Sequence, residues 1–304
     1  MTRAETIPSP ETGEGGRAAK SMSRSGEAAE ASEAAQRARR DEPAKRPGEG
    51  ERRPSVVTTL TRLTSRLRDL ASYANLGGWA FTDSRFLQAQ IEIDPIAARR
   101  ILPWGLRPSR PAIATLFVAH YPQTTWGSTY SEAGLWLHLN SGAVHSPWML
   151  VDDDIALING REMLGYPKKI GEITFEVDGD RVFAEVKRRG ALLFRFRGEL
   201  ERHDEAPPPM LGRPVRNVTG WVGATAQRLI AFHPKEEILE ARRCRLELEM
   251  HGSERDPIHE LGFGRVLTAH WMRVNIGGRG LGFPLPLRPV SPLFWIDNFA
   301  LRFR

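Results

Sequence analysis

The sequence predicts a mostly β domain with a few short helices. Of the 304 residues, 40% are hydrophobic, and the larger apolar side chains are concentrated after residue 55. Many of them lie in short runs that alternate with polar residues or are rich in β-branched and aromatic side chains, which is typical of strands. Glycine and proline separate these runs. We therefore expect one mostly antiparallel β domain over residues 73–304, closed into a barrel or built in two layers so that its edge strands are hidden.

The expected strands follow one another along this domain. The alternation in residues 246–250, Leu-Glu-Leu-Glu-Met, is that of a strand with one face in water. Helical patterns are few and short, and we place them at residues 95–101, 154–164 and 221–230. The expected strands cover residues 86–93, 112–121, 133–140, 175–177, 182–186, 192–197, 244–250 and 270–276.

The first 55 residues differ from the rest of the chain. They contain no Val, Leu, Phe, Tyr, Trp or Cys, so they cannot bury enough apolar surface to offset the entropy of ordering the chain. We expect residues 1–55 to be a disordered low-complexity tail. In residues 56–72, leucines recur at helical spacing, which predicts an amphipathic helix or linker that covers the domain. A membrane-surface or partner helix is the alternative, but the apolar stripe is narrow and lacks aromatic anchors.

Composition excludes several classes of protein. Cys244 is the only cysteine, so an intramolecular disulfide is impossible and a cysteine-based zinc site is not expected. No apolar run approaches the roughly 18 residues of a membrane span, and no secretory signal pattern is present, so we expect a cytoplasmic protein. The net charge of +6 is spread along the chain, which favours a surface that attracts a small anionic substrate over a nucleic-acid-binding face. The eight histidines lack metal-ligand spacing, and we assign no metal.

The most distinctive segment for chemistry is residues 160–171, GREMLGYPKKIG. A helix end followed by glycine and proline leads into two adjacent lysines, Lys168 and Lys169, at the start of a strand. Successive side chains of a strand point to opposite faces, so one lysine would face the interior. Burial lowers a lysine pKa, and the free amine can then attack a ketone to form an imine. Reaching neutrality from about 10.4 requires about 5 kcal/mol, which burial or a neighbouring cation can supply.

This segment resembles the active-site segment of the acetoacetate decarboxylase family, in which a lysine pair follows Gly-Arg-Glu and an aromatic-Pro sequence. Weaker similarity extends to residues 94–106, to residues 256–276 and to Tyr130-Ser131-Glu132, which matches the Tyr-x-Glu of the family. The resemblance covers about residues 75–304. It implies a β-barrel or β-cone, a homo-oligomer and an enzyme without a cofactor.

The resemblance also implies roles for individual residues. Lys168 corresponds to the imine-forming amine, and Lys169 to a cationic neighbour that lowers the pKa of that amine. Glu132 corresponds to the acidic residue that handles protons or orients the lysine. Arg85, which aligns only with a one-residue gap, and Tyr166 are the expected substrate-binding residues.

One departure from the family pattern concerns acidity. The family has a second acidic residue about fifteen positions before the glutamate, whereas residues 114–119, ATLFVA, contain none. The expected pocket is therefore more apolar and suits a bulkier substrate. The sequence predicts a cofactor-independent Schiff-base lyase that decarboxylates acetoacetate or a bulkier β-keto acid to a ketone and carbon dioxide. The alternatives are an imine-forming aldolase or dehydratase acting on a keto acid, and a non-catalytic ligand-binding member of the same fold.

Overall fold

The computed structural model describes residues 60–61, 64, 79–219, 228–278 and 285–290. The chain divides into two compact units, Met1–Thr61 and Arg62–Arg304, and the second contains every strand discussed below. The expected tail, residues 1–55, lies outside the described residues. Of the helix expected over residues 56–72, Leu60, Thr61 and Thr64 are described, and these three are helical.

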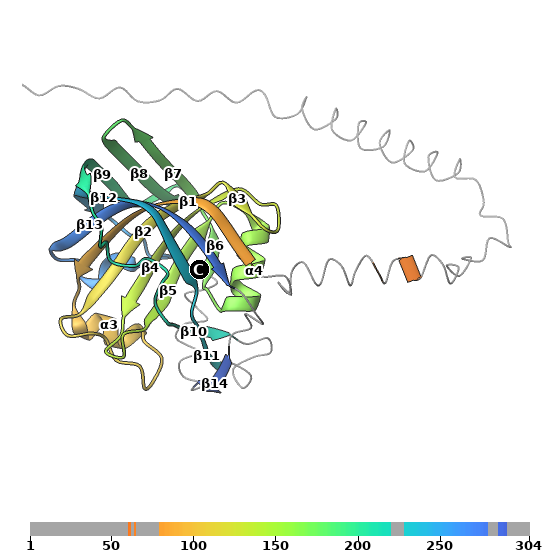
Figure 1. Ribbon diagram of the computed structural model, residues 1–304. Coiled ribbons are helices and arrows are strands. Elements are labelled where there is room, and N and C mark those ends of the chain that lie inside the picture. Colours follow the sequence, from red (N-terminus) through yellow and green to blue (C-terminus); the bar gives the residue numbers. More distant parts are fainter. Residues whose placement is uncertain (1–59, 62–63, 65–78, 220–227, 279–284, 291–304) are drawn as a thin grey trace, which may run out of the picture. The chain divides into compact units, whose positions relative to one another are not determined.

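The second unit is built on a single β-sheet (Figure 1). Within the described ranges the strands are β1 (Trp79–Glu92), β2 (Ile113–Tyr121), β3 (Gln123–Thr124), β4 (Tyr130–His138), β5 (Val144–Val151), β6 (Lys168–Ile170), β7 (Glu172–Asp178), β8 (Arg181–Arg188), β9 (Ala191–His203), β10 (Val215–Thr219), β11 (Arg228–Phe232), β12 (Lys235–Met250), β13 (Val266–Gly278) and β14 (Leu285–Pro289). The helices are α3 (Pro95–Ile101), α4 (Asp154–Leu164) and the 3-10 helix η1 (Ile258–Leu261).

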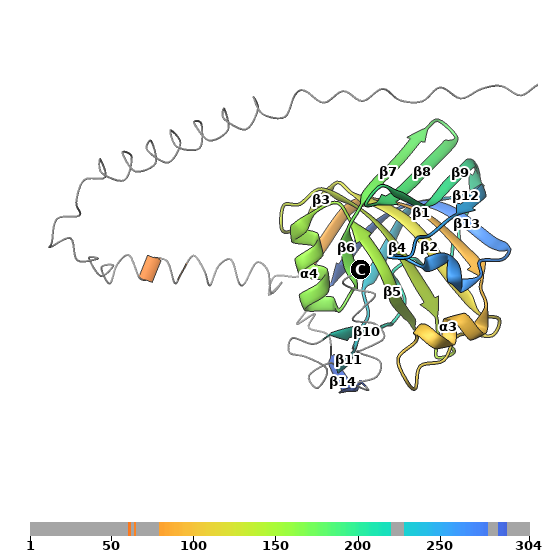
Figure 2. The same ribbon diagram turned by 180° about the vertical axis from the view of Figure 1, so that it is seen from behind.

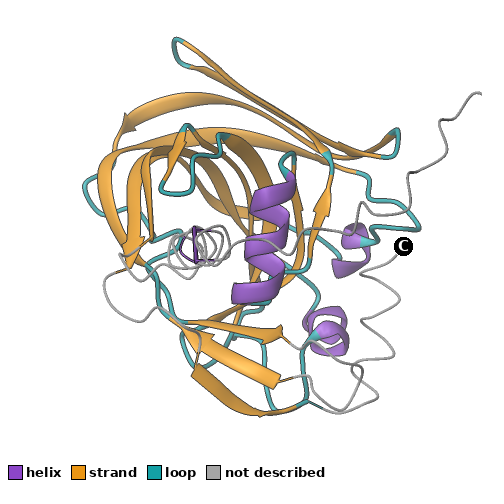
Figure 3. Cartoon of the chain, turned by 90° about the vertical axis from the view of Figure 1, so that its right-hand side faces the viewer, coloured by secondary structure: helices purple, strands orange, loops and turns teal. Residues whose placement is uncertain are grey.

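The strands pair in the order β14-β11-β10-β5-β4-β2-β1-β13-β12-β9-β8-β7, while β3 pairs with β1 and β6 with β5. The pairs β10–β5 and β5–β6 are parallel and the others are antiparallel. The sheet curls strongly, and α4 lies across its concave side (Figure 3). Seen from behind, α3 and α4 lie at different ends of β5 (Figure 2).

The central strands are buried on both faces, which is why β2 and β4 read as nearly continuous apolar runs. One face, here called the α4 face, packs Phe86, Phe117 and Met149 against residues of α4. The other, here called the η1 face, packs Leu87, Leu116 and Leu150 against α3 and η1. Most side chains of β2 and β4 are therefore buried whichever face they point to.

Local sequence explains where the two helices begin and end. The Asp94 side chain accepts a hydrogen bond from the Ile96 amide and Pro95 opens α3, as expected at a helix N-terminus. The Asp153 side chain caps α4 by accepting from the Ala156 amide at 2.7 Å. At the other end of α4, Gly165 has φ +64°, a left-handed conformation that glycine adopts without strain.

The prediction of a mostly β fold with a few short helices is confirmed, and the helices at residues 95–101 and 154–164 have the predicted bounds. The ladder of hydrogen bonds does not close the sheet, since β14 and β7 do not pair within the described residues. The helix expected at residues 221–230 is wrong for Arg228–Ile230, which belong to β11 and pair with β10 and β14; residues 221–227 lie outside the described part. Among the described helices, none has the length and apolar character needed to cross a membrane.

Buried His138 predicts a pH dependence of stability. Its Nε2 lies 2.8 Å from the Thr115 hydroxyl, and burial, helped by Arg213, lowers the pKa of His138 from 6.5 to about 4. Between these values the unfolded chain binds a proton that the folded chain does not, so the free energy of unfolding falls as the pH is lowered from about 6.5 to about 4. The full loss is about 3 kcal/mol. Urea denaturation across this pH range should show that the free energy of unfolding depends less on pH in His138→Gln than in wild type. An equal pH dependence of the two proteins would contradict the prediction.

Candidate active site

Lys168 reaches the α4 face through the register of four neighbouring strands. Phe117 of β2 pairs with Gly134 of β4, Gly134 with Met149 of β5, and Met149 with Lys168 of β6. Directly paired residues share a face, so these four side chains form one row across the sheet. A Cβ on Gly134 would lie 2.5 Å from the Phe117 ring, so the missing side chain makes room for that ring.

Glu132 lies in the next row and meets Lys168 across β5. Its Oε2 is 2.7 Å from Lys168 Nζ, and both side chains are less than a tenth exposed. The rings of Tyr130 and Tyr166 flank the amine, with centroids 5.3 and 5.8 Å from Nζ. Among the described residues, the amine therefore has the Glu132 carboxylate and two aromatic rings as neighbours.

Helix α4 covers Lys168 because it has a glycine at the point of contact. A Cβ on Gly160 would lie 2.6 Å from Lys168 Cδ and 3.0 Å from Nζ. The left-handed turn at Gly165 also passes close to β10, where a Cβ would lie 2.7 Å from the Val218 carbonyl oxygen. Gly160 thus allows the helix to approach the Lys168 side chain, and Gly165 allows the turn after the helix to approach β10.

Lys169 points to the η1 face and has different partners. Its Nζ donates to Asp256 Oδ1 at 2.8 Å, and Arg188 Nη1 donates to Asp256 Oδ2 at 2.8 Å. The Trp148 indole N–H also donates to Asp256 Oδ1, at 3.0 Å. Burial lowers the pKa of Lys169, and the hydrogen bond to Asp256 opposes that effect.

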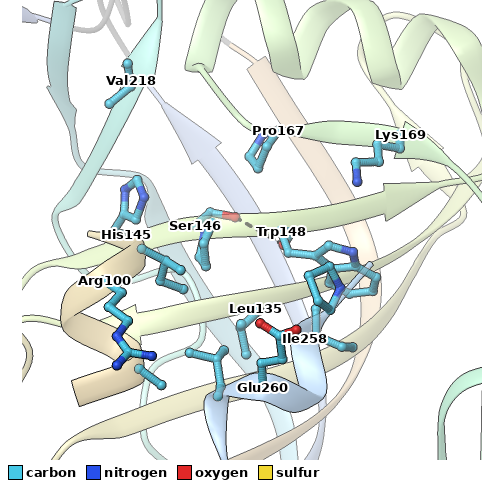
Figure 4. A pocket seen from close by; sticks show the side chains of 15 residues that line it. Arg100, Leu135, His145, Ser146, Trp148, Pro167, Lys169, Val218, Ile258 and Glu260 are labelled. Atoms are coloured by element: carbon cyan, nitrogen blue, oxygen red, sulfur yellow. Dashed lines mark hydrogen bonds between the residues drawn. The ribbon is translucent and has the colours of Figure 1, made fainter. Parts of the chain in front are cut away.

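A cavity of about 470 Å³ lies on the η1 face beside Lys169 (Figure 4). Its walls are mainly apolar, and Arg100, His145 and Glu260 add polar groups. Lys169 lines this cavity, whereas Lys168 does not. Among the described residues, no group of three or more His, Cys, Asp or Glu side chains is placed to hold a metal ion.

The structure therefore brings together some of the expected site residues and separates others. Lys168, Glu132 and Tyr166 meet on the α4 face. The Lys169 side chain points away from Lys168, because adjacent strand residues point to opposite faces. We expected one lysine to face the interior, and the structure buries both. Arg85 is exposed, and its neighbour Phe86 is the residue that points to the α4 face. Strand alternation thus turns Arg85 away from Lys168.

Two residues near the lysines were missed in the sequence. Tyr121 donates its hydroxyl proton to Glu132 Oε1 at 3.2 Å. Asp256 holds Lys169 and Arg188 from a loop before η1. The signal for Tyr121 is the alternation of β2, which puts residues 117, 119 and 121 on one face, but it becomes useful only once the pairing with β4 is known.

Comparison with known proteins identifies the family. The family model described as acetoacetate decarboxylase (ADC) matches residues 70–280. The chain belongs to the acetoacetate decarboxylase family. An acetoacetate decarboxylase of Chromobacterium violaceum is 29% identical over 207 residues, which cover 64% of this chain and 82% of that protein. One from Burkholderia multivorans is 28% identical over 110 residues, covering 35% of this chain and 44% of the relative.

Solved structures of the acetoacetate decarboxylase fold are similar to about 70% of this chain. The acetoacetate decarboxylase of Legionella pneumophila has a TM-score of 0.60 at 18% identity and covers 69% of this chain and 87% of its own. The enduracididine biosynthesis enzyme MppR, complexed with pyruvate, has a TM-score of 0.61 at 20% identity, and the match covers 70% of this chain and 91% of that chain. At these identities the likeness establishes the shared fold.

Replacing Gly160 with alanine should displace Lys168. The added methyl group would occupy space held by the lysine side chain, and we expect at least a tenfold loss of Lys168 reactivity toward a keto acid. Alanine favours a helix over glycine by about 1 kcal/mol, so a loss of folding is not the expected cause. The measurement is the rate at which a keto acid and sodium borohydride modify Lys168, together with the midpoint of urea unfolding. Ile158→Ala, at an exposed position of the same helix, is the matched control, and equal rates for Gly160→Ala and wild type would contradict the prediction.

Replacing Lys169 with methionine distinguishes a structural role, as the partner of Asp256, from the expected role as a cationic neighbour of Lys168. If Lys169 acts mainly through Asp256, Lys169→Met should lower the free energy of unfolding by about 1–3 kcal/mol and leave the pH dependence of Lys168 trapping unchanged. Lys187→Met is the control, since Lys187 pairs with Glu185 near the surface and should cost less than about 1 kcal/mol. A shifted pH dependence with unchanged stability would instead support Lys169 as an electrostatic neighbour.

Proposed function

We propose that this protein is a cofactor-independent lyase in which Lys168 forms a Schiff base with a β-keto acid, and that the reaction is decarboxylation. Membership of the acetoacetate decarboxylase family supports activity of that type. The observation that carries the residue assignment is the buried pair of Lys168 and Glu132, 2.7 Å apart between aromatic rings. Glu132 can take the ammonium proton and so release a nucleophilic amine.

The chemistry then follows from the electron demand of an imine. The free amine attacks the ketone carbon, and with one proton taken up from solvent the hydroxyl group leaves as water, which gives an iminium ion. The bond between the α-carbon and the carboxylate breaks, carbon dioxide leaves, and the bonding pair moves into the iminium to give an enamine. A proton passes to the α-carbon and regenerates an iminium ion, and water hydrolyses this ion to release the ketone and restore the lysine ammonium.

The apolar surroundings favour a substrate bulkier than acetoacetate. Phe117 occupies β2 at the level of Lys168, and Trp136 stacks on it with ring centroids 6.1 Å apart. Phe86 adds a third ring, 6.2 Å from Phe117. These side chains carry no charge for a second carboxylate, and apolar surroundings suit an aliphatic or aromatic substituent.

An imine-forming aldolase or dehydratase is the second candidate. One structural neighbour, MppR, is described in complex with the condensation product of pyruvate and imidazole 4-carboxaldehyde. Residues 114–119 supply no carboxylate, which also suits a reaction other than decarboxylation. A non-catalytic ligand-binding role is the third candidate. A homo-oligomeric, cytoplasmic enzyme acting on a small keto acid remains our expectation.

Borohydride trapping tests the proposal directly. The full chain is incubated with acetoacetate or a longer β-keto acid, reduced with sodium borohydride and digested for mass spectrometry. We expect a reduced adduct on Lys168 that is absent from Lys168→Ala, together with release of carbon dioxide. An adduct on Lys169, which lines the η1-face cavity, would overturn the assignment. An adduct without carbon dioxide indicates aldolase or dehydratase chemistry, and binding without an adduct indicates a ligand-binding protein.

A further inference from the structure

Glu132 uses both carboxylate oxygens within the buried site. Oε2 faces Lys168 Nζ at 2.7 Å, and Oε1 accepts the Tyr121 hydroxyl at 3.2 Å. The three side chains thus form a chain in which the carboxylate lies between the amine and the phenol. All three residues are at most 5% exposed, so bulk water does not replace the phenol as a donor.

Tyr121 is held firmly enough to act as a fixed donor. It pairs directly with Tyr130 across β2 and β4, and their rings lie 4.6 Å apart. The Phe86 ring meets the Tyr121 ring edge-on at 5.6 Å, and the Phe81 ring lies 4.9 Å away. Burial, helped by the nearby Glu132 carboxylate, raises the pKa of Tyr121 well above 10. The phenol therefore stays protonated and donates to Glu132 throughout the working pH range.

Strand β2 offers no carboxylate on this face. Phe117, Ala119 and Tyr121 are its residues that pack on the α4 face. Ala119 is the direct partner of Glu132, and its small side chain leaves space beside the carboxylate. Tyr121 is thus the polar group that β2 contributes next to Glu132.

We propose that Tyr121 is a positioning residue that keeps Glu132 ionised and aimed at Lys168, so that one carboxylate can both accept and return the proton of the reaction. This inference rests on the proposed function. A hydrogen bond to a carboxylate favours its charged form, and the charged form is the one that removes the ammonium proton from Lys168. After carbon dioxide leaves, the same proton passes from the Glu132 carboxyl to the enamine carbon. Hydrolysis of the resulting iminium ion then restores the Lys168 ammonium beside the Glu132 carboxylate.

The test is Tyr121→Phe, which removes the hydroxyl and keeps the ring. Hydrogen bonds to charged groups are strong enough to move a titration by on the order of one pH unit. We therefore expect the acid limb of kcat/KM to move to higher pH by about one unit and kcat to fall roughly tenfold, with a smaller change in KM. Tyr130→Phe is the comparison, because the Tyr130 ring lies against Lys168 but its hydroxyl makes no hydrogen bond to Glu132 in the structure. The rate of Tyr130→Phe can change, but the acid limb of its kcat/KM profile should stay at the wild-type pH.

A second measurement does not depend on turnover. The infrared band of the protonated Glu132 carboxyl, assigned by its loss in Glu132→Gln, should appear at higher pH in Tyr121→Phe than in wild type. An unchanged band, or an equal shift in Tyr130→Phe, would overturn the role of Tyr121. If wild type shows neither an adduct on Lys168 nor turnover, the proposed function fails, and the infrared comparison still decides whether Tyr121 controls the ionisation of Glu132.

Discussion

Burial on both faces of strand β6 is the constraint on which the rest of the site depends. A charged lysine is costly in an apolar interior, and each of the two lysines meets that cost with a carboxylate on its own face. Glu132 serves Lys168, and Asp256 serves Lys169. A strand of three residues, paired with the rest of the sheet through β5, is thereby fixed in register by two ion pairs that act from opposite sides.

The two pairs differ in what surrounds them. On the η1 face, Arg188 and the Trp148 indole complete the shell of Asp256, so that its carboxylate carries three donors. Such a network fixes the position of the Asp256 carboxylate and leaves little of its hydrogen-bonding capacity for a ligand. On the α4 face, the described part of the chain gives Lys168 one carboxylate and two aromatic rings. A proton exchanged between Lys168 and Glu132 leaves two neutral groups in an apolar setting, and that exchange is the first requirement of imine chemistry.

The sequence was sufficient for the strand-rich fold and for the bounds of two of the three helices expected within the β domain, and the family resemblance placed Lys168 and Glu132 in one site. Alternation and spacing are local properties, and the GYPKK segment has a specific pattern. Arg85 could not be judged in the same way, because a shift of one residue along β1 exchanges the two faces and Phe86 takes the inward position. Tyr121 and Asp256 required tertiary information, namely the register of β2 on β4 and the path of the loop before η1. Strand pairing on both sides likewise decided the structure of Arg228–Ile230, where local helical preference pointed elsewhere.

Gly160 has a consequence for how relatives of this chain can be sorted. The helix can approach the lysine strand this closely because position 160 carries no side chain. A homologous chain that keeps the lysine pair but has a larger residue at this position must either move the helix away or lose the placement of its first lysine. The glycine is therefore a criterion for dividing proteins of this fold into those whose first lysine retains this setting and those that share the architecture alone.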